Sequence, residues 1–376
     1  MTANGITTME VRKINRHNIY SFIYEQKVTS KQQIVDALHL SLSTVSQNLK
    51  LLKEEKLIQS PGFYASTGGR KARKIQIIPN AIVALGVGIL KDKIHLAAIN
   101  LYGDVLKSAT KPLIFSMTTD YCRQFGNCIS DFIRGESWNN SSLIGAGIAI
   151  QGVISKDGTR VTYGRILNNT ELKLEDLAAY LPCRSLLFHD SKAAAEAELW
   201  SFKTLKDAVV LLLNDNLGGA LILDRKIYNG LHMYGGLIEH ISLNAKGTLC
   251  YCGSRGCLET YLSADSLKKE AGSDLDTFFQ KVRRKDCKSL AVWEKYLDNL
   301  AFSIRNLQVI TDGDIVISGL LNSYMKKEDF DQISNLVKQM APFPDQKNAL
   351  IAGKHGPLAP AIGSALFFIK DWLERI

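Results

Sequence analysis

The residues of this chain best suited to chemistry are one imidazole and three thiols that lie close together in the sequence: His240, Cys250, Cys252 and Cys257. Such a donor set is typical of tetrahedral zinc. The cysteines form the run Cys-x-Cys-Gly-x-x-Gly-Cys, whose glycines permit the tight turns that bring three sulfurs to one ion. Incidental buried thiols or a redox role are the alternatives. Because no ligand position is left open for water, the pattern predicts a structural zinc knuckle, with one ion per chain.

The elements that position these residues belong to a chain of ordinary globular composition. It has 376 residues, of which 46% are hydrophobic and 22% are charged, and this length suits two or three domains. No segment approaches the roughly 20 apolar residues of a membrane span, and residues 1–10 lack the apolar core of a signal peptide. We therefore expect a cytoplasmic protein without membrane association. There the seven cysteines stay reduced, which favours metal binding over disulfides.

The positive charge of the chain is concentrated at one end. Residues 1–80 contain twelve Lys and Arg but only five Asp and Glu, so this fifth of the chain carries +7 of the net +9. A basic N-terminal region joined to a nearly neutral body predicts a module that binds a polyanion such as DNA. The alternative is a solvated basic surface, which would need no particular fold.

Three helical patterns follow one another in this basic region. The first has apolar residues at helical spacing: Ile14, Ile19, Phe22 and Ile23. The second opens at Ser30, a residue type that caps helix N-termini. A short turn at 39–42 leads to the third. A short helix, a tight turn and a further helix predict a helix-turn-helix.

The third helix has two different faces. Val45, Leu49 and Leu52 form its apolar side. Its other side carries groups that can contact base edges or phosphates, and we predict DNA contacts from Ser43, Thr44, Ser46, Gln47, Asn48 and Lys50. An αα-hairpin without any DNA role is the alternative.

A turn-rich segment at 59–62 and a basic strand at 67–75 follow the third helix. Glycines at 68 and 69 let the backbone approach a sugar-phosphate surface, and arginines can enter a minor groove. These residues predict a β-wing whose DNA contacts are Arg70, Lys71, Arg73 and Lys74. Charge, wing and helices together predict a winged helix-turn-helix DNA-binding domain over residues 1–79.

The rest of the chain alternates between strand and helix patterns, which predicts an α/β architecture. Pro79-Asn80 reads as a linker, and no internal repeat is evident. Strands are expected at 82–89, 93–100, 105–110, 143–150, 185–188 and 208–213, with helices at 121–134 and 192–202.

Taken together, the Thr67-Gly68-Gly69-Arg70 run, the Asp190 segment, the glycines at 218–219 and the His-Cys-Cys-Cys pattern resemble the repressor/open-reading-frame/kinase (ROK) family. The resemblance covers nearly the whole chain, and the N-terminal module is similar to the branch that regulates N-acetylglucosamine, glucose and xylose use. It implies an actin-like (ribonuclease H-like), two-lobed sugar-kinase fold and a homodimer or homotetramer. The expected lobes are residues 80–190 plus 355–376 and residues 191–354, the second carrying the zinc knuckle and an oligomerisation surface.

The sequence departs from the ROK kinases at both phosphate loops. Where the family has Asp-x-Gly-Gly-Thr, this chain has Leu85-Gly86-Val87-Gly88-Ile89, so we expect Leu85 at the place of the acid. Where the family has Gly-Thr-Gly-x-Gly-Gly, this chain has Asn214-Asp215-Asn216-Leu217-Gly218-Gly219, and Asp215 would repel a phosphate. Both changes predict that the chain is not an enzyme.

The sugar site that the resemblance implies is partly retained. Asp190 keeps the family's carboxylate, preceded by His189 instead of Asn. The family's Glu-x-Gly-His becomes Leu237-Ile238-Glu239-His240, so Leu237 replaces the sugar-binding acid. His240 joins zinc and sugar in the family. The predicted ligand contacts are His189, Asp190, His240 and Glu259; Asp190 as a helix N-cap is the alternative.

The resulting interpretation is a transcriptional repressor of carbohydrate genes. It would bind double-stranded operator DNA and respond to a small carbohydrate, or to a sugar phosphate if His189 is cationic. Two alternatives stay open: an active ROK sugar kinase with a DNA-binding extension, and a repressor with a vestigial sugar site controlled by a protein partner.

Overall fold

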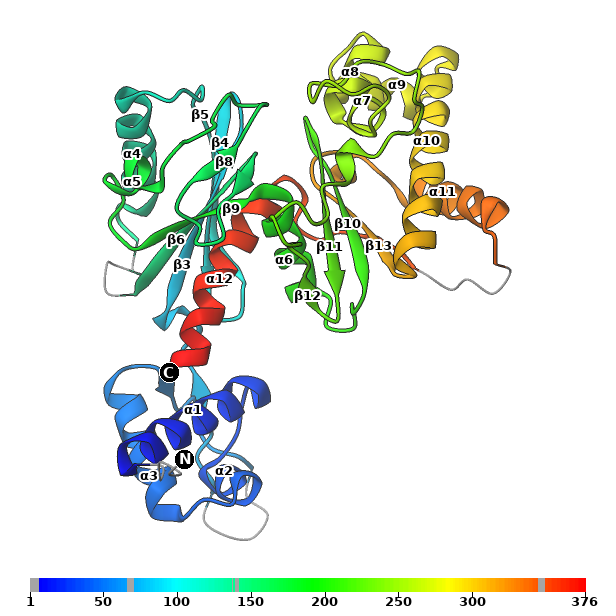
Figure 1. The fold of residues 1–376 in the computed structure, drawn as a ribbon. Coiled ribbons are helices and arrows are strands. Elements are labelled where there is room, and N and C mark those ends of the chain that lie inside the picture. Colours follow the sequence, from blue (N-terminus) through cyan, green and yellow to red (C-terminus); the bar gives the residue numbers. More distant parts are fainter. Residues whose placement is uncertain (1–6, 66–70, 137, 139–141, 344–348) are drawn as a thin grey trace, which may run out of the picture.

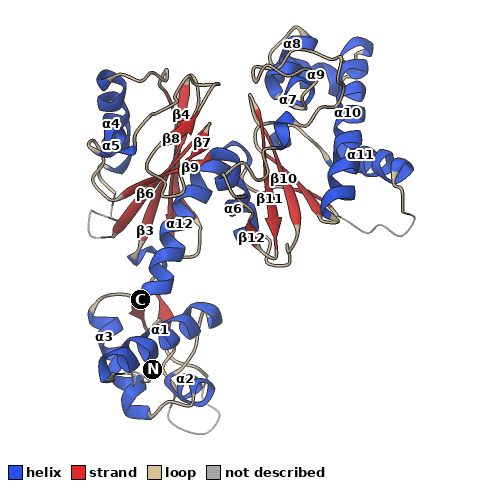
Figure 2. Cartoon of the chain, in the orientation of Figure 1, coloured by secondary structure: helices blue, strands red, loops and turns tan. Residues whose placement is uncertain are grey.

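The computed structural model describes residues 7–65, 71–136, 138, 142–343 and 349–376. Figure 1 shows a small N-terminal unit below two larger α/β units, and Figure 2 shows that strands lie inside these larger units with helices around them. Among the described residues, no helix combines the length and apolar character that crossing a bilayer requires.

The N-terminal unit consists of three helices and a short antiparallel hairpin. Its elements are α1 (Thr8–Gln26), α2 (Lys31–Leu38), α3 (Leu42–Glu54), β1 (Ile58–Gln59) and β2 (Gln76–Ile77). Ser30 and Ser41 cap α2 and α3, each accepting a hydrogen bond from a backbone N–H three residues on. The predicted start of the second helix at Ser30 is therefore confirmed, and the third helix begins at Leu42, one residue inside the turn expected at 39–42.

The core of this unit confirms one expected face and corrects another. Val45, Leu49 and Leu52 of α3 are buried, as predicted. Ile14 is 49% exposed, however, so its predicted place on the apolar face of α1 is wrong. The buried side of α1 is formed by Ile19, Tyr20 and Ile23, so Tyr20 belongs to the buried face in place of Ile14.

The first larger unit contains a mixed sheet whose strand order is β5-β4-β3-β6-β9 within the described residues. Pairs β3–β4 and β4–β5 are antiparallel, and β3–β6 and β6–β9 are parallel. The strands are β3 (Val83–Ile89), β4 (Lys93–Asn100), β5 (Val105–Pro112), β6 (Leu143–Ile150) and β9 (Ser185–His189). A small hairpin, β7 (Val153–Ile154) with β8 (Val161–Tyr163), and the helices α4 (Thr119–Ile133) and α5 (Leu174–Ala178) accompany this sheet.

The second larger unit repeats this arrangement. Its described strands are ordered β12-β11-β10-β13-β14, with the central strand first in sequence and its neighbours in the same parallel and antiparallel relations. The strands are β10 (Ala208–Leu213), β11 (Leu217–Leu223), β12 (Lys226–Ile227), β13 (Asp314–Ser318) and β14 (Leu350–Ala352). Helices α7 (Glu259–Leu262), α8 (Ala264–Ala271), α9 (Leu275–Arg283), α10 (Cys287–Thr311) and α11 (Lys327–Met340) complete the unit. The fold is thus internally duplicated, although the sequence shows no repeat.

Two helices join the units. α6 (Asp190–Ser201) packs against α12 (Ala359–Arg375), and Figure 1 shows both between the two sheets. Gly363 of α12 approaches the backbone of Ala193 so closely that no Cβ would fit there. This contact fixes α6, and with it the residues at its first turn, relative to both sheets.

The N-terminal unit is docked on this helical layer through aromatic side chains. Tyr20 contacts Trp372 of α12 edge-on, and Tyr24 stacks on Tyr102 of the β4–β5 turn with ring centroids 4.8 Å apart. Lys27 lies over the Tyr102 ring, and Tyr24 Oη donates to the Leu101 carbonyl. These contacts show that the predicted linker at 79–80 connects units that touch each other.

Candidate functional site

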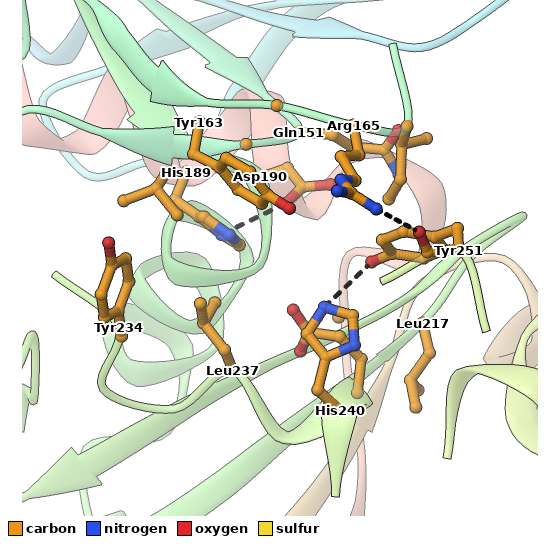
Figure 3. Close-up of a pocket in the computed structure, with 16 residues that line it drawn as sticks. Gln151, Tyr163, Arg165, His189, Asp190, Leu217, Tyr234, Leu237, His240 and Tyr251 are labelled. Carbon is orange, nitrogen blue, oxygen red and sulfur yellow. Dashed lines mark hydrogen bonds and ion pairs between the residues drawn. The ribbon is translucent and has the colours of Figure 1, made fainter. Parts of the chain in front are cut away.

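A cavity of about 280 Å³ lies where the two larger units meet. Figure 3 shows Asp190 beside Gln151, Tyr163 and Arg165 on one side of it, and Leu217, Leu237 and His240 on the other. Three of the four predicted ligand residues, His189, Asp190 and His240, line this cavity. Leu237 lines it too, and supplies the apolar wall that the sequence indicated.

The junction of β9 and α6 carries the first two of these residues. Asp190 is the first residue of α6 and His189 is its N-cap, so the alternative of Asp190 as the N-cap is wrong. Asp190 Oδ1 accepts a hydrogen bond from the Ser191 backbone N–H at 2.7 Å. Burial lowers the pKa of His189 even though Asp190 raises it, which favours a neutral ring. A cationic His189 that attracts a sugar phosphate is therefore not favoured.

His240 faces two regions at once. Its Nδ1 lies 3.9 Å from Cys250 Sγ, and its Nε2 lies 3.4 Å from the Tyr251 hydroxyl, at the cavity wall. The short 3₁₀ turn Ile238–His240 holds the ring in this orientation. The imidazole thus connects the cysteine cluster with the cavity through its two nitrogens.

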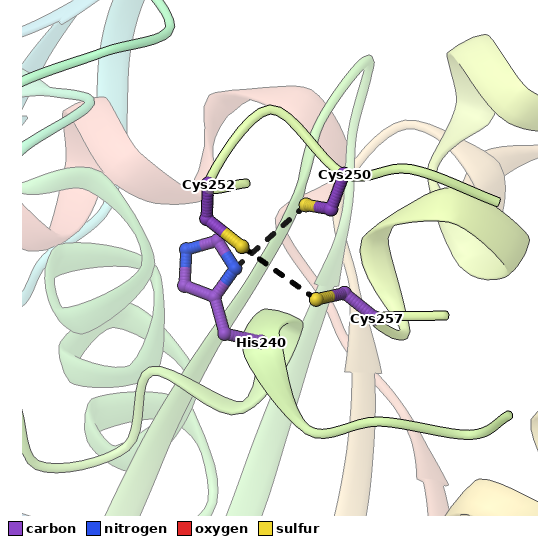
Figure 4. A group of neighbouring side chains, drawn as sticks. All are labelled: His240, Cys250, Cys252 and Cys257. Carbon is purple, nitrogen blue, oxygen red and sulfur yellow. Dashed lines mark hydrogen bonds between the residues drawn. The ribbon is translucent and has the colours of Figure 1, made fainter. Parts of the chain in front are cut away.

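The predicted metal ligands come together in space, as Figure 4 shows. Their donor atoms all lie within 4.8 Å of one another, and Cys252 Sγ is 3.7 Å from Cys257 Sγ. A tetrahedral ion with bonds of about 2.3 Å to sulfur requires sulfurs roughly 3.8 Å apart. Burial and the neighbouring thiols raise the pKa of Cys257 to about 12, and a bound cation would reverse this by stabilising the thiolate. The cluster therefore fits a metal ion.

Glu239 is a residue of the cavity that the sequence analysis did not identify. It lines the cavity, is 5% exposed, and its Oε2 has no hydrogen-bond partner among the described residues. Burial, with Asp190 and Glu259 nearby, raises its pKa to about 8. The sequence feature that could have identified Glu239 is its position directly before His240, where the ROK family has glycine. The sequence analysis registered only the acid lost at Leu237.

Glu259 has a different environment from the other predicted ligand residues. Its carboxylate accepts hydrogen bonds from Asn216 Nδ2 at 2.9 Å and from the Leu217 N–H at 2.7 Å. It does not line the cavity. Its role in the structure is to hold the turn between β10 and β11, and its direct contact with a ligand stays a prediction.

A second cavity, of about 380 Å³, adjoins the first and shares Gln151 and Asp190 with it. Lys268 lies 2.8 Å from Asp215 and 2.5 Å from Asp265, and Lys93 lies 3.8 Å from Asp215. The expected repulsion of phosphate by a bare Asp215 is therefore not what the structure shows. Asp215 is paired with lysines that also pair with Asp92 and Asp265, and these ion pairs line the cavity.

The strand that precedes this cavity corrects a further expectation. Leu85 is fully buried in β3 and lines neither cavity, so its predicted place at the phosphate-loop acid is wrong. Instead, Gly88 and the turn at 90–92 border the second cavity. Gly218 and Gly219 belong to β11 and not to a loop, and a Cβ at Gly219 would collide with Ile238.

A third, shallow groove of about 730 Å³ runs over the N-terminal unit between α3 and the hairpin. Its described lining contains five cationic side chains and no carboxylate; the cations are Lys31, Lys50, Lys53, Lys71 and Arg73. Phe63, at 55% exposed, and Ser46 also line this groove.

The predicted DNA contacts differ in how available they are. Ser43, Gln47, Lys50, Lys71 and Arg73 are exposed, whereas Lys74 is half-buried near the Tyr64 ring. Ser46 Oγ and Asn48 Nδ2 donate to helix carbonyls of Leu42 and Thr44, and the Thr44 hydroxyl lies 2.9 Å from Ser41 Oγ. Arg70 lies outside the described residues.

Comparison with known proteins places the chain in a family. The model of the ROK family matches residues 84–371, so the chain belongs to the ROK family. The xylose repressor of Caldicellulosiruptor bescii is 24% identical over 270 residues, which cover 68% of this chain and 65% of that relative. The chain thus matches slightly less than two thirds of the length of this relative.

Solved structures agree on the fold. A ROK family transcriptional regulator, described as a homolog of the E. coli MLC protein, superposes with a TM-score of 0.76 at 19% identity and covers 96% of both chains. A ROK family glucokinase from Streptomyces griseus, solved with glucose and AMPPNP, superposes with a TM-score of 0.67 at 18% identity. That match covers 76% of this chain and 98% of the glucokinase. The α/β, sugar-kinase-like fold is therefore confirmed.

Proposed function

We propose that this protein is a DNA-binding transcriptional repressor of carbohydrate genes, controlled by a sugar or sugar derivative. The observation that carries this proposal is the cationic groove between α3 and the hairpin, whose described lining holds five basic side chains and no acid. In this reading, residues 1–79 act as a winged helix-turn-helix: α3 enters the major groove, and Lys71 and Arg73 of the wing contact the backbone or minor groove. The xylose repressor named above supports this assignment.

The sugar would bind in the 280 Å³ cavity. Asp190 is placed to accept hydrogen bonds from hydroxyl groups, neutral His189 can donate or accept, and His240, with Nδ1 on the metal, can donate from its Nε2–H. The cysteine cluster would hold one structural zinc ion through His240 Nδ1 and three thiolates, leaving His240 Nε2 for the ligand. The ion supplies a fixed orientation for the imidazole and for the turn that carries it.

Helix α6 supplies a physical connection between the cavity and the DNA-binding unit. It begins at Asp190 in the cavity, and near its other end Trp200 Nε1 donates to the Tyr102 carbonyl at 2.9 Å. Tyr102 in turn stacks on Tyr24 of α1. A ligand that shifts α6 would therefore change the docking of α1, and with it the spacing of the DNA-binding units in a homodimer or homotetramer. In this proposal one lobe consists of residues 80–190 and 355–376, and the other of residues 191–354. The hinge lies where the chain passes from one lobe to the other.

Electrophoretic mobility shift and fluorescence anisotropy with the operator-containing DNA upstream of the regulated genes test the proposal. Replacing Lys50 with Ala should weaken binding by about 5- to 10-fold and reduce the salt slope by about one, because one phosphate contact is lost. Lys13→Ala is the matched control, since Lys13 is exposed on α1 outside the groove. Equal losses in both variants would contradict the assignment of the groove.

A further inference from the structure

Glu239 is the buried carboxyl group whose hydrogen bonding the chain leaves incomplete. The side chain is 5% exposed, yet it lines the cavity, and Oε2 has no partner among the described residues. Leaving a buried acceptor without a hydrogen bond is unfavourable, and the groups that remain so tend to have a functional reason. The free acceptor atom therefore points to a partner from outside the chain.

The neighbours of Glu239 do not supply that partner. Lys192 is 8% exposed, and its Nζ donates to the Met233 carbonyl at 2.8 Å. Leu237, two residues before Glu239, brings only an apolar wall to the cavity. Asp190 also lines the cavity, but no hydrogen bond joins it to Oε2 of Glu239.

The charges around the cavity define what the partner is. Two carboxyl groups, Asp190 and Glu239, face the cavity, whereas the Arg165 guanidinium donates to the Tyr251 carbonyl at its rim. An anionic group next to Glu239 would meet a second acid, Asp190, and the lining cation Arg165 is engaged with the Tyr251 carbonyl. A neutral hydroxyl can donate directly to Oε2.

We propose that Glu239 is a ligand-binding residue of this cavity, whose Oε2 accepts a hydrogen bond from a hydroxyl group of a neutral sugar. This inference rests on the proposed function, because it assumes that the cavity binds a sugar. It restores to the site an acid that the sequence at Leu237 lacks, but from a different position along the chain. It also selects neutral polyhydroxylated ligands over sugar phosphates.

Isothermal titration calorimetry on the full, zinc-loaded chain tests the proposal with D-xylose, D-glucose, N-acetyl-D-glucosamine and D-glucose 6-phosphate. For the neutral sugar that binds most tightly, Glu239→Ala should weaken binding by about 10-fold or more, because a buried hydrogen bond to the ligand is lost. Glu239→Gln keeps the shape and one oxygen, and should have a smaller effect. Glu328→Ala, an exposed glutamate of α11, should change affinity by less than about 2-fold.

Monodeoxy analogues of the bound sugar separate ligand contact from a structural role. One of them should bind the wild-type chain about 10-fold more weakly than the parent sugar, and should lose no further affinity in Glu239→Ala, because both changes remove the same hydrogen bond. If, for every analogue, the loss of affinity caused by the deoxy position and the loss caused by Glu239→Ala multiply, the two changes are independent and the proposal is overturned. The proposal is also overturned if Glu239→Ala binds the sugar with wild-type affinity while Asp190→Ala abolishes binding. That result would leave the proposed sugar site intact. Absence of binding by all four compounds would overturn the sugar site and this proposal together.

Discussion

The two adjoining cavities between the larger units differ in how their polar groups are satisfied. Around the second cavity, the phosphate half, Asp215 pairs with Lys268 and Lys93, and Lys268 also pairs with Asp265. Around the first cavity, the sugar half, Glu239 has an unpartnered oxygen among the described residues. There His240 Nε2 contacts the Tyr251 hydroxyl at the long distance of 3.4 Å. Groups that are satisfied within the chain offer little to a ligand, whereas groups that are not satisfied create a binding site. The comparison indicates that the first cavity offers unsatisfied polar groups to a ligand, whereas the charged groups that line the second cavity are largely paired within the chain.

The largest expected effect of this difference is on phosphoryl transfer. Kinases ordinarily turn over at about 1 per second or faster. Sugar-dependent ATP hydrolysis by this chain should stay below about one thousandth of that rate. The reason is that Asp215 and its ion pair with Lys268 line the second cavity, whereas the sequence of the family's kinases has Gly-Thr-Gly at this position. A coupled assay of ADP release with D-xylose or D-glucose measures this. Turnover near 1 per second would show that the phosphate half is functional.

Loss of the metal should be the next largest effect, and it should act on the sugar half alone. Cys257→Ser should reduce bound zinc from one ion per chain to well below one and lower the melting temperature by about 6–12 °C, since metal binding contributes to folding. Sugar binding should be lost with it, because His240 belongs to both sites. Metal analysis and thermal unfolding measure these changes. Cys287→Ser, an exposed cysteine outside the cluster, is the control.

The phosphate half should show a specific pH dependence of stability. Burial, followed by the charge of Lys93, lowers the pKa of His95 to about 4, although Asp215 and Asp92 act in the opposite direction. The unfolded chain therefore takes up a proton at this residue first, near pH 6.5, so the stability contribution is complete above that pH and is lost as the pH falls towards 4.

Urea unfolding at pH 7 and pH 5 measures this contribution. Between these values the wild-type chain should lose about 2 kcal/mol more of its free energy of unfolding than His95→Gln. Glutamine keeps a hydrogen-bonding group near Thr110, which lies 2.8 Å from His95 Nδ1. Equal losses in both chains would mean that His95 is not held neutral.

The smallest expected effect compares one acid from each half. Asp190→Asn should weaken sugar binding by about 10-fold, because a hydrogen bond to a carboxylate is replaced by one to an amide. Asp215→Asn should change sugar affinity by less than about 2-fold, since that side chain is satisfied by Lys268 and Lys93. Calorimetry with the same sugar measures both. A larger effect of Asp215→Asn would show that the two cavities act as one site.

Local patterns in the sequence were sufficient for most of the individual elements. The strands at 93–100, 143–150 and 208–213 were predicted with their observed bounds, because continuous apolar runs between turn residues have few other stable conformations. The four metal ligands were equally predictable. They are separated by only ten, two and five residues, so the sequence alone brings them near one another.

Relations between distant residues were beyond what the sequence determined. The duplicated sheet order depends on which strands pair, and equivalent strands need share only their hydrophobicity, so no repeat is visible in the sequence. Lys268 neutralises Asp215 from 53 residues away. Ile14 and Tyr20 show the same limit at short range, because the docking surface of α1 decided which side of the helix is buried.

The sequence by itself thus determined the local elements, the metal cluster and the basic N-terminal unit, since each depends on residues close together in the chain. Only the tertiary structure decided which polar groups are satisfied. Glu239 next to His240 and Asp215 before β11 are both plain acids in the sequence. Their difference arises because folding places lysines beside Asp215 and leaves Oε2 of Glu239 facing a cavity, and a buried charge takes its role from its surroundings.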